Sequence, residues 1–388
     1  MKPESSELEV KRPVETGEDS DEESPGAALL GAKKARLMAS RQCPYLDTID
    51  RGLLDFDFEK LCSVSLSRIN CYACLVCGKY FQGRGSNTHA YTHSVSDNHR
   101  VFLNLETKKF YCLPDNYQVI DASLGDILYV LNPTFTPDLI QRLANSSKEA
   151  RAYDGTKYIP GVVGLNNIKA NDYMNVILQA LSHVEGVRNY FLDEKNYMHI
   201  LATRPPGDQS FELVTRFGEL IRKLWNPKNF KAHVSPHEML QAVVLCSKKQ
   251  FQITEQGDTG MFLPWFLNSL HMALGGTKKK KSSIIYKNFL GSMKIHTKKI
   301  IPSDLDGFKR LEAEKSGEFE WREEESPFLF LTTELPAPPL FKDEIHENII
   351  PQVSLYNLLS KFNGETEKEY KTYKDNFLKR FELTKLPM

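Results

Sequence analysis

Cys74 and Cys77 are separated by two residues, and three histidines, His89, His93 and His99, follow within a short stretch. A Cys-x-x-Cys turn presents two thiolates to one ion, and nearby histidines complete a tetrahedral shell of nitrogen and sulfur. Four protein ligands are typical of a structural zinc site, because a catalytic site keeps one position open. The spacing therefore predicts a zinc ion that stabilises this part of the chain.

The segment 74–99 resembles the ubiquitin-binding zinc finger family, in which a Cys-x-x-Cys turn and three spaced histidines recur. The resemblance implies that Cys74, Cys77, His93 and His99 form the metal site. It also implies capture of a free ubiquitin C-terminus, with a zinc-stabilised fold that binds another partner as the alternative.

A second metal site of that family is only partly kept in this sequence. Cys62 and His89 remain, but Ser65 and Gln82 stand where the family has two further cysteines. We therefore expect Cys62 and His89 to be remnants that serve in packing, and we expect one structural zinc ion.

Residues 164–181 resemble the cysteine box that opens the catalytic domain of the ubiquitin-specific proteases. The matching positions are Gly164, Leu165, Asn167, Tyr173, Met174, Asn175, Leu178 and Gln179. The resemblance places Asp172 at the position of the nucleophilic cysteine and Asn167 at the oxyanion position. The nucleophile is therefore replaced, while one oxyanion donor remains.

Asp172 changes the chemistry that this position offers. Cysteine proteases attack with a thiolate whose pKa is lowered by a helix N-terminus and a neighbouring histidine. Asp172 directly precedes a helical run, so we expect its carboxylate to cap the helix and to interact with the helix dipole. A carboxylate held in this way is a weak nucleophile toward an amide carbonyl, and we predict no peptidase activity.

The resemblance continues downstream through a glutamine box at 255–271 and strand-like segments near Phe289 and Phe328. The histidine and aspartate boxes, which the family places later, have no counterpart in the sequence. We therefore expect a protease-like domain that is incomplete at its C-terminus and lacks a general base.

Four segments of different composition contain these motifs. Residues 1–40 hold acidic and basic runs without an aromatic residue, which predicts a disordered charged tail. Residues 41–120 are assigned to the zinc finger, and 121–157 to a linker whose helix begins at Pro137. Residues 158–388 are assigned to the protease-like domain.

The last segment changes in periodicity along its length. Apolar residues at helical spacing mark its first half: Phe211, Val214, Phe217, Ile221 and Leu224. Short β-rich stretches follow at 284–286, 293–295 and 328–331. Helices followed by a sheet predict an α+β fold. The resemblance implies a papain-like architecture with a helical thumb and partial fingers and palm.

Composition restricts the partners and the compartment. Fifty basic and fifty acidic residues cancel, so no global field attracts nucleic acid or membrane. No apolar run is long enough to span a bilayer, and the N-terminus lacks a signal peptide core. Six of the seven cysteines lie within the first 112 residues, which in a reducing compartment indicates metal binding rather than disulfides.

Sequence segments that together cover most of residues 43–387 resemble the inactive branch of this protease family found in the spliceosome. The resemblance implies a nuclear, non-enzymatic scaffold for tri-snRNP assembly or maintenance, with spliceosomal proteins as partners. A ubiquitin-binding adaptor is the second hypothesis. A third is direct RNA contact through Lys278–Lys281, for which a solvated turn is the alternative.

Overall fold

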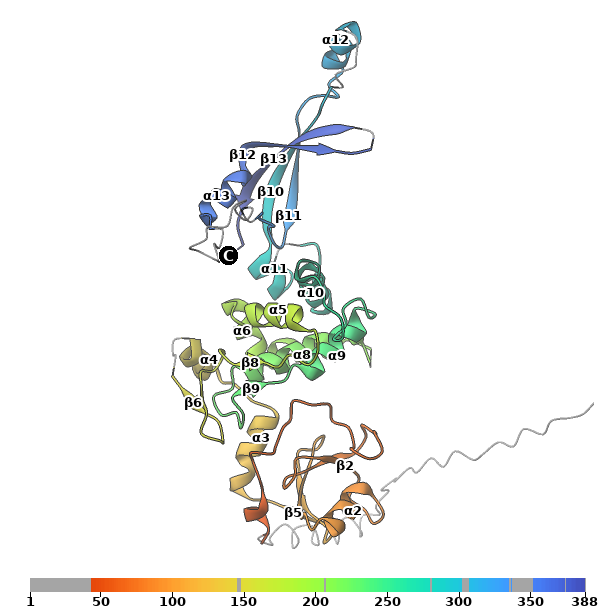
Figure 1. The fold of residues 1–388 in the computed structure, drawn as a ribbon, viewed down its shortest axis with the longest axis vertical. Helices are drawn as coiled ribbons and strands as arrows, with labels where there is room; N and C mark the ends of the chain where they lie inside the picture. Colours follow the sequence, from red (N-terminus) through yellow and green to blue (C-terminus); the bar gives the residue numbers. More distant parts are fainter. Residues whose placement is uncertain are drawn as a thin grey trace, which may run out of the picture. The chain divides into compact units, whose positions relative to one another are not determined.

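The computed structural model describes residues 43–388, apart from 145–147, 206, 280, 302–306, 335, 337–351, 374 and 388. The predicted tail at 1–40 lies outside the described residues. The chain divides into two compact units (Figure 1). One comprises Met1–Asp50 and Lys60–Leu124, and the other comprises Arg51–Glu59 and Gly125–Met388.

The first unit is built on a five-stranded antiparallel sheet with the order β2-β1-β3-β4-β5. Its elements are η1 (Leu46–Thr48), β1 (Cys71–Cys74), β2 (Tyr80–Gln82), α2 (His89–Ser96), β3 (Val101–Asn104), β4 (Phe110–Cys112), β5 (Tyr117–Val119) and η2 (Ala122–Leu124). Phe102 and Leu113 are fully buried in its core. The strands are only three or four residues long, so much of this unit consists of connecting loops.

The second unit begins with two short helices, α3 (Gly125–Leu131) and α4 (Pro137–Ala144). The amide of Leu139 donates to the Thr136 hydroxyl at 3.3 Å, which satisfies one free donor in the first turn of α4. Two short strand pairs follow along the chain: β6 (Ala150–Arg151) with β7 (Lys157–Tyr158), and β8 (Gly164–Leu165) with β9 (His233–Val234).

A group of helices forms the main core of this unit. They are α5 (Asp172–Ser182), α6 (Glu185–Leu192), α7 (Lys195–Leu201), α8 (Gln209–Leu224), α9 (His237–Cys246), α10 (Thr259–Ala273) and α11 (Ile284–Phe289). The predicted apolar face of 211–224 is buried throughout, which confirms that helix. Among the described residues, no helix combines the length and the apolar character required to cross a membrane.

A four-stranded antiparallel sheet with the order β11-β10-β13-β12 follows the helices. Its strands are β10 (Gly291–Lys299), β11 (Arg322–Phe328), β12 (Asn363–Lys371) and β13 (Asn376–Lys385). Three short helical segments, α12 (Gly307–Lys315), α13 (Leu355–Leu359) and η3 (Ser360–Phe362), lie in its connections. Helices followed by a sheet confirm the α+β prediction.

Two of the three strand predictions in this region need correction. Residues 284–286 begin helix α11, because Ser283 caps it by accepting the Tyr286 amide at 3.2 Å and Ile285 is buried among helices. The stretch 328–331 is the end of a strand rather than its centre, since β11 uses the charged residues before Phe328. Cross-strand pairing to β10 overrides their low strand propensity.

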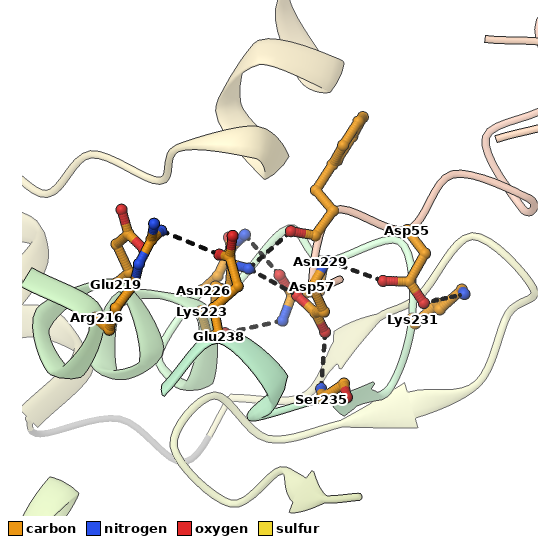
Figure 2. A network of polar contacts seen from close by, with 11 residues as sticks. Asp55, Asp57, Arg216, Glu219, Lys223, Asn226, Asn229, Lys231, Ser235 and Glu238 are labelled. Atoms are coloured by element: carbon orange, nitrogen blue, oxygen red, sulfur yellow. Dashed lines mark hydrogen bonds and ion pairs between the residues drawn. The ribbon is translucent and has the colours of Figure 1, made fainter. Parts of the chain in front are cut away.

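Residues 51–59 form a strap that packs on the second unit, although both flanking segments belong to the first. Leu54 and Phe56 are buried, and the polar side chains between and beside them bind lysines (Figure 2). Asp57 lies 3.0 Å from the Lys223 ammonium and accepts the Ser235 amide at 2.8 Å. No local pattern predicts this contact, because it joins residues far apart in the chain.

Lys223 is the centre of the strap contact. Its ammonium also donates to the Phe56 carbonyl at 2.9 Å, and its side chain is only 13% exposed. Burial opposes its charge, but the hydrogen bond to Asp57 and attraction to Asp57, Glu238 and Glu219 together outweigh this effect, so that the pKa of Lys223 is raised. A second pair, Asp55 with Lys231 at 2.6 Å, is more open to solvent.

We predict that Asp57→Ala lowers the free energy of unfolding of the second unit by about 3 kcal/mol, because it leaves the buried Lys223 ammonium without its counter-charge. Asp55→Ala is the matched control, and its loss should be about 1 kcal/mol or less. All three tryptophans lie in the second unit, so tryptophan fluorescence during urea unfolding measures this unit. Equal losses in the two variants would contradict the assigned role of Asp57.

Candidate metal centre and protease-like site

The first unit brings four possible metal ligands together: Cys74, Cys77, His93 and His99. Cys74 ends β1, Cys77 lies in the following turn, His93 lies on α2, and His99 lies between α2 and β3. One ligand atom from each falls within 4.8 Å of all the others. The sheet and one helix thus place two thiols and two imidazoles around a common point.

Two of the three separations within this cluster match a tetrahedral zinc shell, and the third is slightly shorter. His93 Nε2 lies 3.0 Å from His99 Nδ1 and 3.4 Å from Cys77 Sγ, and Cys74 Sγ lies 3.5 Å from His99 Nδ1. Zinc bonds of about 2.0 Å to nitrogen and about 2.3 Å to sulfur place neighbouring ligand atoms about 3.3–3.8 Å apart. The donor set and its geometry therefore suit zinc.

The two thiols of the cluster differ in acidity. A hydrogen bond from the Cys74 thiol lowers the pKa of Cys77 to about 4, and the same interaction raises the pKa of Cys74. One thiolate is therefore present at neutral pH before a cation binds, while the Cys74 proton must be displaced by the ion.

Residues around the cluster orient the His93 ring. The Asp97 carboxylate accepts a hydrogen bond from His93 Nδ1 at 2.8 Å, which leaves the Nε2 lone pair facing the other ligands. Phe81 stacks on the same ring with centroids 4.1 Å apart. Sequence reasoning missed Asp97, although its position four residues after His93 on a helix is a detectable signal.

The positions of the family's second metal site carry a hydrogen-bonded cluster. The Ser65 hydroxyl donates to Gln82 Oε1 at 2.8 Å, and the Ser65 amide donates to Cys62 Sγ at 3.4 Å. Hydrogen bonds therefore join three of the four positions that metal ligands would occupy. His89 begins α2, and no contact between its side chain and this cluster occurs in the described part of the chain.

A further pair of cysteines is also joined by a hydroxyl. The Tyr117 hydroxyl forms hydrogen bonds with both Cys43 and Cys112. Burial raises the pKa of Cys112 to about 11, so this thiol stays protonated at neutral pH. Cys43 and Cys112 are therefore linked through a tyrosine hydroxyl rather than grouped with histidines, and the ligand cluster found among the described residues does not include them.

Arg84 is already engaged within the finger. Its guanidinium lies 4.4 Å from the centre of the Tyr111 ring and donates to Asn116 Oδ1. A ubiquitin C-terminal carboxylate would have to compete with these contacts. Gly85 beside it has open space where a side chain would stand.

In the second unit, Asp172 is the first residue of α5 and is exposed, whereas Asn171 is the N-cap and fully buried. The prediction that Asp172 caps the helix is therefore wrong by one position. Among the described residues, no hydrogen bond or ion pair holds the Asp172 side chain. Its carboxylate still lies in the first turn, where the helix dipole favours negative charge.

Asn171 takes the N-cap position because its side chain forms hydrogen bonds inside the preceding loop. Its amide oxygen accepts the amides of Ile168 at 2.7 Å and Lys169 at 3.3 Å. Its amino group donates to Asn175 Oδ1 at 3.1 Å, and its backbone amide donates to Asn167 Oδ1 at 3.2 Å. Asn167 is thus held through its oxygen, and its amino group has no hydrogen-bond partner among the described residues.

The glutamine-box segment packs directly against this loop and helix. Tyr173 crosses toward Gly257, where an added methyl group would lie 2.5 Å from the Tyr173 ring. The Tyr173 hydroxyl donates to the Gln252 carbonyl at 3.1 Å, and Asp258 caps α10 by accepting the Gly260 amide at 2.6 Å. The loop and helix around Asp172 are therefore well packed, although a carboxylate stands where the resemblance implied a thiol.

We predict that Asp97→Ala weakens zinc binding by about 10- to 100-fold while all four ligands remain, because the His93 ring loses its orienting carboxylate. Competition with a colorimetric chelator measures the affinity. Asp97→Asn keeps a hydrogen-bond acceptor and should lose less. Unchanged affinity in Asp97→Ala would show that Phe81 and the backbone alone orient His93.

Two family models match the chain. Residues 62–124 match the model described as the zinc finger in ubiquitin-hydrolases and other proteins, and residues 163–387 match ubiquitin carboxyl-terminal hydrolase. The first match agrees with the class of site that the Cys and His residues form, and it indicates zinc as the metal.

Individual proteins extend this similarity over nearly the whole chain. Ubiquitin carboxyl-terminal hydrolase 39 of Homo sapiens is 64% identical over 96% of this chain and 66% of its own length. Pre-mRNA-splicing factor SAD1 of Saccharomyces cerevisiae is 31% identical over 88% of this chain and 69% of its own. The chain spans about two thirds of the length of these relatives.

A solved structure supports the fold. The crystal structure of an essential yeast splicing factor superposes with a TM-score of 0.64 at 30% identity, covering 89% of this chain and 75% of that one. The protein described here belongs to the ubiquitin carboxyl-terminal hydrolase family and carries that family's zinc finger.

Proposed function

We propose that this chain is a non-catalytic scaffold of the splicing machinery, acting in tri-snRNP assembly or maintenance in the nucleus. Similarity to relatives that are themselves named splicing factors, extending through both units, carries the proposal. Spliceosomal proteins are its expected partners. The protease-like unit would supply a folded surface for protein contacts rather than a reaction centre.

Asp172 supports the non-catalytic part of this proposal. An exposed carboxylate at the start of α5 is a poor nucleophile toward an amide carbonyl. No histidine forms a hydrogen bond with Asp172 in the part of the chain that the structure describes, so no imidazole is held there to protonate a leaving amine. Asn167 is the residual oxyanion position, and a donor for an oxyanion is of no use without an attacking group.

In the same proposal, Cys74, Cys77, His93 and His99 hold one structural zinc ion. The ion would stabilise loops that the small sheet of the first unit cannot hold by packing alone. Cys62 and His89 would contribute to packing, because Ser65 and Gln82 are joined by a hydrogen bond in place of metal ligands.

The alternative of a ubiquitin-binding adaptor has less support from the geometry. Arg84 matches the arginine of a Gly-Arg-Tyr turn in the ubiquitin-binding zinc fingers that this unit resembles, and it is paired with Asn116 and Tyr111. A titration of the full chain with ubiquitin that has a free C-terminus separates the two hypotheses. Saturable binding that Arg84→Ala abolishes would favour the adaptor.

We predict that affinity purification of the tagged chain from nuclear extract recovers tri-snRNP proteins. The expected cause is a protein–protein surface, so recovery should persist after nuclease treatment and should be the same for Asp172→Ala. Mass spectrometry of the eluate measures it. Recovery of ubiquitin conjugates without splicing proteins would overturn the scaffold proposal.

We also predict that Asp172→Cys does not create a deubiquitinase. A thiol alone lacks the base that forms the thiolate and protonates the leaving amine. Release of a fluorophore from a ubiquitin C-terminal amide should stay at the level of the unmodified chain. Turnover by Asp172→Cys would contradict this prediction. If a further histidine-to-alanine substitution removed that turnover, the substituted histidine would be identified as the base.

A further inference from the structure

Three lysines from different parts of the second unit surround one shallow pocket. Lys281 comes from the loop between α10 and α11, Lys287 lies on α11, and Lys385 ends β13. Tyr286 and Ser292 also line the pocket, and its lining contains no acidic residue. We call this set the lysine pocket; α11 lies at the end of the sheet where β10 begins (Figure 1).

The lysine pocket lies in a strongly asymmetric part of a neutral chain. Residues 259–303 contain eight lysines and no aspartate or glutamate. The β10 lysines of this stretch find partners on other strands or loops, as Lys294 does with Glu323 at 2.7 Å and Lys299 with Asp375 at 2.9 Å. Structural pairing therefore neutralises part of the positive charge but not all of it.

The lysines of the pocket and of the adjoining loop are available to bind another molecule. Among the described residues, no ion pair engages the three pocket lysines or their neighbours Lys278 and Lys279, all of which are exposed. Five ammonium groups that lack counter-charges form a local positive field, whereas the chain as a whole has no net charge.

The framework beneath these lysines is ordered. The Ser282 hydroxyl accepts the Thr277 amide at 3.0 Å and donates to the Thr277 carbonyl at 2.8 Å, which closes the loop. Lys281 has a φ of 68°, so the chain turns sharply where its side chain enters the pocket lining. Pairing of β13 with β10 places Lys385 opposite Ser292.

A stacked pair of aromatic rings packs α11 against α10. His271 and Tyr286 stack with centroids 3.6 Å apart, and His271 Nδ1 lies 2.7 Å from the Ser283 hydroxyl. Burial lowers the pKa of His271, so it adds no charge of its own at neutral pH. The ring stack and the Ser283 contact thus hold the helix that carries Lys287.

We propose that the lysine pocket, with Lys278 and Lys279 beside it, binds the phosphate backbone of RNA without reading its bases. Lysine ammonium groups act as point charges toward phosphates, whereas phosphopeptide sites rely on the bidentate fork of arginine, which the pocket lacks. The choice of RNA over other polyanions rests on the proposed role in splicing. None of these lysines belongs to the metal cluster or to the Asp172 loop.

The test is binding of the full zinc-loaded chain to a fluorescent single-stranded RNA of mixed sequence, measured by anisotropy at several salt concentrations. Lys281→Gln, Lys287→Gln and Lys385→Gln together should weaken binding at least about tenfold and reduce the slope of log K against log salt by about 2. Replacing the same three residues by arginine keeps the charges and should retain the slope.

Lys195→Gln, Lys248→Gln and Lys249→Gln form the matched control, since these lysines are also exposed and have no ion pair within the described ranges. The control changes net charge equally and should leave affinity and slope nearly unchanged. Equal behaviour of the two triple variants would overturn the proposal. The proposal would also be overturned if the pocket variant kept its RNA binding but lost binding to a phosphoserine peptide or to phosphatidylserine vesicles.

The RNA-binding experiment and the co-purification experiment can fail separately. Co-purification of splicing proteins after nuclease treatment tests the protein surface, while anisotropy with purified chain tests the pocket. Loss of RNA binding with unchanged co-purification supports both proposals. Absence of RNA binding in the unmodified chain rejects only the lysine pocket.

Discussion

Burial of one face of α5 fixes where residue 172 stands. Met174 and Leu178 are fully buried, and Tyr173 packs on Gly257 of the glutamine-box segment. These contacts depend on shape and apolar area, not on the side chain that the helix start presents to solvent. The fold can therefore persist with an exposed aspartate, Asp172, at the start of α5. Packing keeps the fold of the ubiquitin carboxyl-terminal hydrolases, while the chemistry of a single exposed position is free to change.

The same separation between framework and chemistry is visible in the zinc finger. The four ligands at Cys74, Cys77, His93 and His99 converge because a sheet and a helix hold them. At Ser65 and Gln82, where the resemblance implied further metal ligands, the two side chains form a hydrogen bond that joins the loops. A hydrogen bond between neutral groups contributes far less than a metal ion to holding a loop. The surrounding sheet must then supply the rest, which agrees with the full burial of Cys62.

Charge is distributed in the second unit according to function as well as stability. Lys223 is buried and its charge is balanced by Asp57 of the strap, so that substitution acts mainly on stability. Lys287 and Lys385 are exposed beside one pocket and have no such balance among the described residues. Charges of the first kind hold segments of one chain together, and charges of the second kind attract a partner. Counting lysines in the sequence does not distinguish them.

Local patterns in the sequence predicted much of this protein. Cys-x-x-Cys with spaced histidines predicted the ligand cluster, and apolar periodicity predicted α8, because ligand spacing and helix period are short-range properties. Tertiary structure decided what depends on distant partners. Residues 284–286 became a helix under a Ser283 cap and core packing, and Asn171 took the cap position that Asp172 was expected to fill. The strap contact of Asp57 with Lys223 and the meeting of Lys385 with Lys281 join residues about 100 or more positions apart. Only the folded chain brings such groups together, since their pairing leaves no periodic signal in the sequence.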